Sequence, residues 1–480
     1  MAAREDIVSD FDALRNALAA VHRMMLSGDS AAALANLQEL ERAHPASGLL
    51  WQERGFCLRP HGGEDAVEAA FRRAVELNDA LPEAWRHLMD VARAAGRSAD
   101  ADRAARALAK LDSLPAELIE GSSRLSEGDL AGAEARIRGY LKRHGPHLDG
   151  MRLLAQVCMH RRNYEDAELL LEAVLDRNPD YHEARYELGM VFMQRRRIYP
   201  ALLQARRLLP LDPTDRKTRM LYANACDGLG KFEEALRVYR QLQQEMPGDP
   251  ELEFAVAGVL RNQGKPQDAI AEYRRAMRLE GCAGTGYAAL ANMKTYRFSD
   301  QEIAEMRRLE RAEESPARRF PVCFALGKAL EDRGEYEESF EQYARGNALR
   351  RAESHYNPET TERNLAMREE LFTPEFLAGR RGMGCLRPDP IFIVGMPRAG
   401  STLLEQVLAS HSQVDGTLEL PEIPRLVRQF RGRSSEDVGR YATVLAELTP
   451  QELQRLGEIY LEETRVYRER APFFVDKLPG

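Results

Sequence analysis

Residues 228–250 read GLGKFEEALRVYRQLQQEMPGDP, and residues 262–280 read NQGKPQDAIAEYRRAMRLE. One short sequence motif therefore recurs, with its glycine, alanine and tyrosine at the same positions. Working outward, alanine returns at steps of 33 or 34 residues, at Ala32, Ala66, Ala99, Ala133, Ala167, Ala201, Ala235 and Ala269. Proline recurs in a second phase, at Pro146, Pro179, Pro213 and Pro247. A fixed period of this length indicates an array of one repeated supersecondary unit.

The recurring residues suit a pair of antiparallel helices. An alanine lets two helices approach closely, and the tyrosine four residues later, as in Tyr239 after Ala235, lies on the same helix face. Gly230 and Gly264 supply the turn between the helices, and the prolines end the second helix. The pattern resembles the tetratricopeptide repeat, and this resemblance implies a right-handed α-solenoid with a concave groove.

We expect nine or ten such repeats over residues 1–351. The repeat is expected to be degenerate near 281–320, where the closing proline is lost. It recovers at Gly334, Tyr336 and Tyr343, and Ser339 then stands two periods of about 35 residues after Ala269.

The concave face of the array is expected to bind an extended segment of a protein or peptide. Positions 15, 11 and 8 before each recurring alanine should line it, giving Tyr186, Met190, Met193, Met220, Asn224, Asp227, Phe254 and Arg261. The alternative is that these side chains contact only solvent or the protein's own C-terminal part.

Composition narrows the class of protein. The chain has 480 residues, with 68 Lys and Arg against 76 Asp and Glu, a net charge of −8, which disfavours a protein that coats nucleic acid. No apolar run long enough to cross a membrane occurs, and acidic residues stand where a signal peptide would be apolar. The cysteines occur singly, which indicates free thiols in a reducing compartment: Cys57, Cys158, Cys226, Cys282, Cys323 and Cys385. A cytoplasmic protein without a membrane partner is expected.

A connector is expected at 352–389, where the repeat pattern dissolves into turns rich in proline and glycine. Residues 390–411, PIFIVGMPRAGSTLLEQVLASH, then predict a strand, a glycine loop and a helix. The run 391–394 is typical of a parallel strand that is buried on both faces. Leu404, Val407 and Leu408 are expected on one side of the helix. This arrangement directs backbone N–H groups and a helix dipole at a phosphate.

The loop departs from the loop of nucleoside-triphosphate enzymes. Gly395 and Gly400 have the spacing of GxxxxGK, but Ser401 replaces the lysine and Arg398 supplies the positive charge. A kinase would lose the cation that neutralises its outer phosphates. A kinase therefore remains only a disfavoured alternative, and the loop indicates a different anion.

Residues 390–424 with 473–480 resemble the sulfotransferases that use 3′-phosphoadenosine 5′-phosphosulfate. Together with the preceding repeats they resemble the bacterial tetratricopeptide-repeat sulfotransferases related to tyrosylprotein sulfotransferases. The resemblance implies that Arg398, Gly400, Ser401 and Thr402 hold the 5′-phosphosulfate of this co-substrate, with no metal. Ala399 replaces the family's usual serine, which leaves backbone amides to compensate.

The same resemblance places the catalytic base at Glu419, 21 residues after Arg398. Sulfuryl transfer to a hydroxyl needs a base for the departing proton, and burial can raise the pKa of a carboxyl towards working pH. Two alternatives stay open. Glu419 or Glu422 can simply begin a helix, and His411 can act as the base instead of filling the structural role that the family gives a histidine there.

Residues 473–480, FFVDKLPG, predict a second buried strand. They match a family element with a lysine at the strand end, and Lys477 would then face the ligand crevice and stabilise charge on the leaving oxygen. A lysine on the surface is the alternative. The span 436–469, with Leu448, Leu453, Leu456, Ile459 and Tyr460 in helical phase, predicts an amphipathic helix without a chemical role.

The expected fold is therefore mostly α, a repeat solenoid over 1–351 followed by part of an α/β sulfotransferase domain over 390–480. The expected function is transfer of sulfate to a hydroxyl of a protein or peptide. The alternative is a repeat scaffold whose C-terminal segment is catalytically silent. Because family members continue beyond Gly480 into further strands and the donor's 3′-phosphate site, we expect an incomplete domain and poor or absent sulfate transfer by this chain. Its last strand should show an unpaired edge and exposed Phe473 and Phe474.

Overall fold

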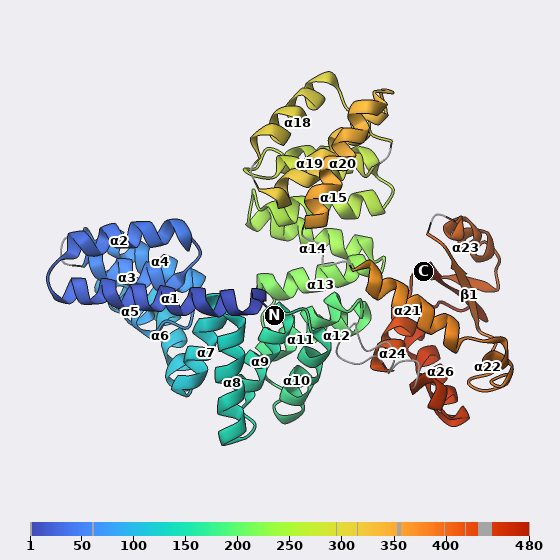
Figure 1. Ribbon diagram of the computed structural model, residues 1–480, viewed down its shortest axis with the longest axis horizontal. Coiled ribbons are helices and arrows are strands. Elements are labelled where there is room, and N and C mark those ends of the chain that lie inside the picture. Colours follow the sequence, from blue (N-terminus) through green and yellow to red (C-terminus); the bar gives the residue numbers. More distant parts are fainter. Residues whose placement is uncertain are drawn as a thin grey trace. The chain divides into compact units, whose positions relative to one another are not determined.

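A computed structural model of the chain describes residues 2–59, 62–293, 295–313, 315–352, 357–397, 399–417, 419–430 and 444–479. The protein is mostly helical, and over these residues its single sheet lies near the C-terminus (Figure 1). Contacts divide the chain into two compact units, Met1–Gln194 and Arg195–Gly480. Within the described ranges, no helix combines the length and apolar character needed to cross a bilayer.

The first unit is a series of helical hairpins in which the two helices of a hairpin pack against each other, as α3 does against α4 and α5 against α6 (Figure 1). Its helices are α1 (Ala2–Leu26), α2 (Ser30–Ala43), α3 (Gly48–Leu58), α4 (Glu64–Leu77), α5 (Pro82–Ala94), α6 (Ser98–Asp112), α7 (Ala116–Ser126), α8 (Leu130–His144), α9 (Leu148–His160), α10 (Tyr164–Arg177) and α11 (His182–Gln194).

The second unit continues the hairpins and ends in a small α/β part. Its repeat helices are α12 (Ile198–Leu208), α13 (Arg216–Gly228), α14 (Phe232–Glu245), α15 (Pro250–Asn262), α16 (Pro266–Ala276), α17 (Ala283–Ala291), α18 (Asp300–Ala312), α19 (Pro316–Glu331) and α20 (Tyr336–Ala352). The elements that follow are α21 (Pro358–Leu371), α22 (Pro374–Ala378), β1 (Pro390–Gly395), α23 (Ser401–Ala409), β2 (Val414–Gly416), α24 (Glu422–Phe430), α26 (Pro450–Glu463), the 3₁₀ turn η1 (Thr464–Tyr467) and β3 (Phe473–Pro479).

The recurring alanines pack as expected in the later repeats but not in the first three. Five of the recurring alanines are fully buried, and each of the five is the fourth residue of its helix: Ala133, Ala167, Ala201, Ala235 and Ala269. The fourth position of α2, α4 and α6 is instead Ala33, Val67 and Ala101, and all three are buried. The expected phase is therefore wrong at Ala32, Ala66 and Ala99, because the buried position falls one residue later in α2 and α4 and two residues later in α6.

In four successive repeats the turn between the helices has one backbone conformation whatever residue fills it. Gly230 and Gly264 have φ of 72° and 73°, in the left-handed region, as expected for a glycine that ends a helix. Arg162 and Arg196 stand one period apart at the equivalent turns, with φ of 58° and 61°. A side chain is strained there, so these two repeats keep the turn at a cost in conformational energy.

The degenerate segment still folds as helices. Helix α17 packs mainly against α19, whereas regular repeats pack each helix against its immediate neighbour. The regular pattern returns at Ser339, which is 3% exposed and donates a hydrogen bond to the carbonyl of Gly327 over 2.7 Å. In the connector, α21 and α22 form but bury none of their described residues.

The sheet is parallel and has the order β1-β3-β2 in the described part of the chain. The last strand is therefore central, and the expected unpaired edge at its position is wrong: Phe474 is fully buried. The edges belong to β1 and to β2, which is only three residues long and gives too short a pattern to be predicted. Val394 of β1 is 78% exposed, so the expected burial of this strand on both faces is also wrong.

Helices cover the two faces of the sheet differently. Helix α23 packs on β1, β2 and β3 from one side. On the other side Leu420, Leu426, Tyr460, Leu461 and Phe474 form a core between α24, α26 and β3. Residues 436–443 of the expected helix lie outside the described residues, and α26 begins only at Pro450. Tyr460 in this helix is buried, and Leu456 and Ile459 pack against the same core, as an amphipathic helix requires.

Candidate active site

The strand, loop and helix form as the sequence predicts. Strand β1 ends at Gly395, and α23 begins at Ser401 after Gly400, whose φ of 89° only glycine adopts easily. The first turn of α23, with Ser401 and Thr402, thus follows directly on the loop. The backbone N–H groups of such a first turn form an anion site together with the helix dipole. Arg398 lies outside the described residues, so its side chain is not placed.

Lys477 is buried at the carboxyl end of the central strand. Its ammonium Nζ lies 3.0 Å from Glu405 Oε2 and donates a hydrogen bond to Thr402 Oγ1 over 3.2 Å. The same nitrogen lies 3.7 Å from Glu419 Oε1. With its side chain 11% exposed, Lys477 is not the surface lysine of the alternative interpretation. The strand end therefore brings together residues that are up to 75 positions apart in the chain.

Glu405 is the site residue that sequence reasoning missed. The expected apolar face of α23 is largely open to solvent, with Leu404 49% and Val407 59% exposed, while Glu405 is 6% exposed. The helix turns a carboxylate inward because Lys477 projects from the strand beneath it. The available signal was a lone acid in an otherwise apolar turn of the helix.

The other acids at this end of the sheet differ in burial. The side chain of Glu419 is 60% exposed and accessible from solvent. Glu422 begins α24, as the alternative interpretation allows, and burial raises its pKa to about 7. His411 is exposed, and its ring nitrogen Nδ1 accepts a hydrogen bond from the backbone N–H of Gln413 over 3.2 Å. This local turn gives His411 a structural contact.

Asp476 occupies the opposite face of β3 from Lys477. Its Oδ2 accepts a hydrogen bond from the Tyr460 hydroxyl over 2.8 Å, and both residues are buried. Burial raises the pKa of Asp476 and, with the nearby Asp476 carboxyl, that of Tyr460. Adjacent residues of one strand thus serve two different polar clusters.

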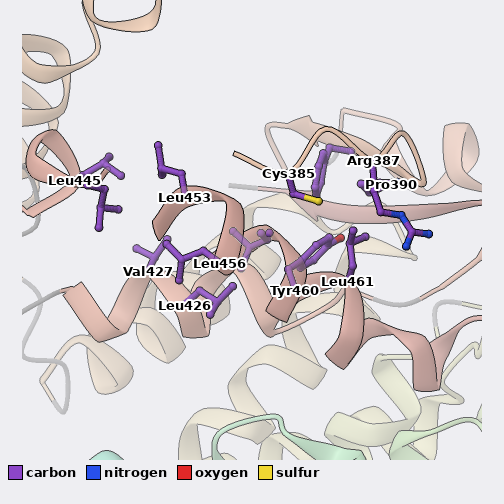
Figure 2. A pocket seen from close by; sticks show the side chains of 14 residues that line it. Cys385, Arg387, Pro390, Leu426, Val427, Leu445, Leu453, Leu456, Tyr460 and Leu461 are labelled. Atoms are coloured by element: carbon purple, nitrogen blue, oxygen red, sulfur yellow. The ribbon is translucent and has the colours of Figure 1, made fainter. Parts of the chain in front are cut away.

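A separate apolar pocket of about 270 Å³ lies beside α24 and α26 (Figure 2). Phe392 of β1 and Tyr460 line it, so it belongs to the sheet face opposite α23. None of the expected site residues that the structure describes takes part in its lining. The remaining residues that line it are Cys385, Arg387, Pro390, Ile423, Leu426, Val427, Leu445, Leu448, Leu453, Leu456, Gly457 and Leu461.

The expected groove residues of α13 are mostly engaged within the repeats. Met220 is buried. The Tyr239 hydroxyl donates a hydrogen bond to Asn224 Oδ1, and Asn262 Nδ2 donates one to Asp227 Oδ1 over 3.3 Å. These contacts join neighbouring helices of the array. The capture of a peptide at these positions stays a prediction.

The geometry defines a class of protein: helical repeats followed by an α/β domain with a glycine loop between its first strand and helix and a buried lysine at the carboxyl end of its central strand. Comparison with known families agrees with both parts. Residues 390–480 match the model of the sulfotransferase family. Residues 124–188 and 223–280 match tetratricopeptide repeat models, and residues 160–242 match that of subunit 3 of the anaphase-promoting complex, or cyclosome. The chain therefore combines tetratricopeptide repeats with a C-terminal domain of the sulfotransferase family.

Individual relatives cover parts of the chain. An uncharacterized protein of Aquifex aeolicus (strain VF5) is 31% identical over 194 residues, which are 39% of this chain and 25% of that protein. The chain thus spans about a quarter of the length of this relative. A tetratricopeptide repeat protein of known structure from Parabacteroides merdae ATCC 43184 is 17% identical, covering 65% of this chain and 95% of its own, with a TM-score of 0.32. The structure of MamA AMB-1 is 20% identical, covering 34% of this chain and 96% of its own, with a TM-score of 0.31.

Proposed function

We propose that the C-terminal domain transfers a sulfuryl group from 3′-phosphoadenosine 5′-phosphosulfate to a hydroxyl of a protein or peptide that the repeats recruit. The observation that supports this proposal is the position of Lys477. Its Nζ lies 3.2 Å from Thr402 Oγ1 on the loop helix and 3.7 Å from Glu419 Oε1. One cation thus lies between an anion-binding helix end and an accessible carboxylate, and the transfer reaction requires both groups.

Donor binding is assigned to Arg398, Gly400, Ser401 and Thr402. The left-handed conformation of Gly400 supports the assignment, since it leads the chain directly from the loop into the first turn of α23. There the backbone N–H groups can bind phosphate oxygens, and the two hydroxyls add donors. The role of Arg398 rests on the family resemblance of the loop.

The reaction assigned to the remaining residues transfers one proton to Glu419 and one sulfuryl group to the acceptor oxygen. Glu419 accepts the proton of the acceptor hydroxyl while that oxygen bonds to sulfur. The bond between sulfur and the 5′-phosphate oxygen breaks, and Lys477 donates a hydrogen bond to the oxygen that leaves. A positioned cation of this kind stabilises charge that develops in the transition state.

The first experiment measures thermal unfolding of the chain with and without 3′-phosphoadenosine 5′-phosphate, with ATP as the comparison. A saturable shift for the first nucleotide, and a weaker one for ATP, is expected because ligand binding stabilises the folded domain. Absence of any shift would favour a repeat scaffold with a silent C-terminal segment. A comparable saturable shift for ATP would support the alternative assignment of the domain as a kinase.

The second experiment compares Glu419→Gln with Glu447→Gln, which changes an exposed acid of the same domain. Sulfate transfer to co-expressed proteins, followed by mass spectrometry, should fall in Glu419→Gln and persist in Glu447→Gln. Nucleotide binding should persist in both, because the base acts on the acceptor. Equal loss of binding and transfer in Glu419→Gln would indicate a structural role.

A further inference from the structure

Helix α23 buries a carboxylate where a helix on a sheet usually buries an apolar side chain. Glu405 is 6% exposed, whereas Leu403, Leu404 and Val407 on the same helix are 72%, 49% and 59% exposed. Removing a carboxylate from water costs free energy unless it is paired. The location of Glu405 therefore depends on its partner, and the partner is Lys477.

The contacts of the ammonium show how the pair is arranged. Glu405 Oε2 lies 3.0 Å from Lys477 Nζ, with the two side chains 8% and 11% exposed. Thr402 accepts a hydrogen bond from the same nitrogen, one helical turn before Glu405 and on the same helix face. Two residues of one helix therefore fix the end of a flexible four-carbon side chain.

Glu419 differs from Glu405 in distance and in exposure. It lies 3.7 Å from the ammonium, and its side chain is 60% exposed. An exposed pair at this distance contributes little, whereas a short buried pair holds its geometry. Glu405 is thus the residue that fixes Lys477, and Glu419 keeps the accessibility that a base needs.

We propose that Glu405 is the positioning residue for Lys477: it holds the ammonium between the donor loop and Glu419 and offsets its charge in the resting site. The catalytic part of this inference rests on the proposed sulfotransferase function. Because Glu405 offsets that charge, Lys477 acts through a hydrogen bond at a fixed place more than through net attraction for the donor. Loss of Glu405 should then lower turnover without weakening the binding of an anionic nucleotide.

The test is a double-mutant cycle with Glu405→Gln, Lys477→Met and the double variant, with Gln406→Ala as the matched control on the exposed side of α23. Glu405→Gln alone should lower the rate of sulfate transfer about tenfold to a hundredfold, the effect of losing one positioned charged hydrogen bond. In the Lys477→Met background it should have little further effect, because Glu405 acts through Lys477. Affinity for 3′-phosphoadenosine 5′-phosphate should be kept or improved in Glu405→Gln. Additive losses in the cycle, or a weakened nucleotide affinity equal to the loss of rate, would overturn the proposal.

A second measurement tests whether Glu405 positions Lys477, and it does not require the protein to transfer sulfate. The chain is treated briefly with an amine-acylating reagent, and the labelling of Lys477 is compared with that of exposed Lys265 by mass spectrometry. Lys477 should label faster in Glu405→Gln than in the wild type and unchanged in Gln406→Ala. Unchanged labelling in Glu405→Gln would refute the positioning role even if the enzyme is active. If the wild type neither binds the nucleotide nor transfers sulfate, the proposed function fails while the labelling still tests the contact.

Circular dichroism shows whether Glu405→Gln folds. If it does not, Glu405→Asp provides the same readouts, since it keeps the charge and withdraws it by one methylene. Faster labelling of Lys477 and a lower rate are expected there too. A wild-type rate and labelling in folded Glu405→Asp would contradict a requirement for fixed geometry.

Discussion

Replacing Glu422 with glutamine should make the C-terminal domain more stable at alkaline pH and change little at acid pH. Glu422 is 6% exposed, and its Oε2 has no hydrogen-bond partner among the residues that the structure describes. Burial disfavours the charged carboxylate and raises its pKa from 4.5 to about 7. The protonated acid therefore fits the folded domain better than the carboxylate does.

The sign and size of the effect follow from linkage. Above about pH 4.5 the unfolded chain loses this proton while the folded chain keeps it, so stability falls as the pH rises towards about 7. Above that pH the full cost remains, at about 3–4 kcal/mol for a pKa difference of this size. At pH 5 it is below about 1 kcal/mol. Glutamine never ionises, so the variant avoids the cost.

Hydrogen exchange of the backbone amides of β3, followed by mass spectrometry, measures this difference locally. At pH 8 exchange should be about 200- to 400-fold slower in Glu422→Gln than in the wild type, and at pH 5 the two should differ by less than about fivefold. Each comparison is made at one pH, which cancels the intrinsic dependence of exchange on pH. Glu447→Gln, at an exposed acid, should show no difference at either pH. Equal protection of wild type and Glu422→Gln at pH 8, or faster exchange in the variant, would refute the reasoning.

Three further substitutions test packing, backbone strain and a buried hydrogen bond. Gly55→Ala would put a Cβ within 2.8–2.9 Å of the buried Phe71 ring, so it should lower the melting temperature of the chain, at a cost of about 1–3 kcal/mol. Arg162→Gly should stabilise the first unit in urea unfolding by up to about 1–2 kcal/mol, because it relieves a left-handed backbone at φ 58°. Tyr460→Phe leaves Asp476 Oδ2 without its hydroxyl partner and should weaken the protection of β3 amides by about 1–3 kcal/mol.

Neighbouring positions provide controls for these substitutions. Gly63→Ala should be nearly neutral, since a Cβ there meets nothing within 4 Å and the glycine does not have a positive φ. Gly230→Ala should act in the opposite direction to Arg162→Gly, because it introduces a side chain into a turn of the same conformation. A destabilised Arg162→Gly would mean that the arginine side chain contributes more than the strain costs. Unchanged exchange in Tyr460→Phe would mean that Asp476 has another adequate partner.

The repeats were predictable because their signal is local and recurs many times. Ala235 and Tyr239 lie on the packed face of one helix, and Gly230 forms the turn before it, so the residues within one repeat are enough to predict its structure. The first three repeats were predicted out of phase because alanine is common in their helices, so an alanine one or two positions before the buried residue, such as Ala32 before Ala33, continued the period. The arginines in left-handed turns show a conformation that the array imposes on an unsuitable residue, which no local pattern reveals.

The candidate site was only partly predictable, because its residues meet through the order of the strands. The sequence indicated the loop and Lys477, but β2 is too short for a pattern, and without it β3 seemed to be an edge. Glu405 was missed because its inward direction depends on a lysine 72 positions away. The leucines beside Glu405 favoured the prediction that they form a buried apolar helix face. The ion pair between Glu405 and Lys477 instead turns the carboxylate towards the sheet and leaves Leu404 exposed.

Asp476 and Lys477, adjacent residues near the end of β3, point to opposite faces of the sheet. The register of this strand therefore depends on the pairing of charged groups as well as on packing. Sliding β3 by one residue would turn Asp476 towards the acid of α23 and would leave Lys477 facing the aromatic core around Tyr460. Both displaced groups would then be buried beside unsuitable neighbours. A single-residue insertion or deletion in the chain leading into β3 is therefore far more harmful than a change of the same length in the solvent-facing turns between repeats. Natural variants and designed hybrids of this domain should keep the length of that approach.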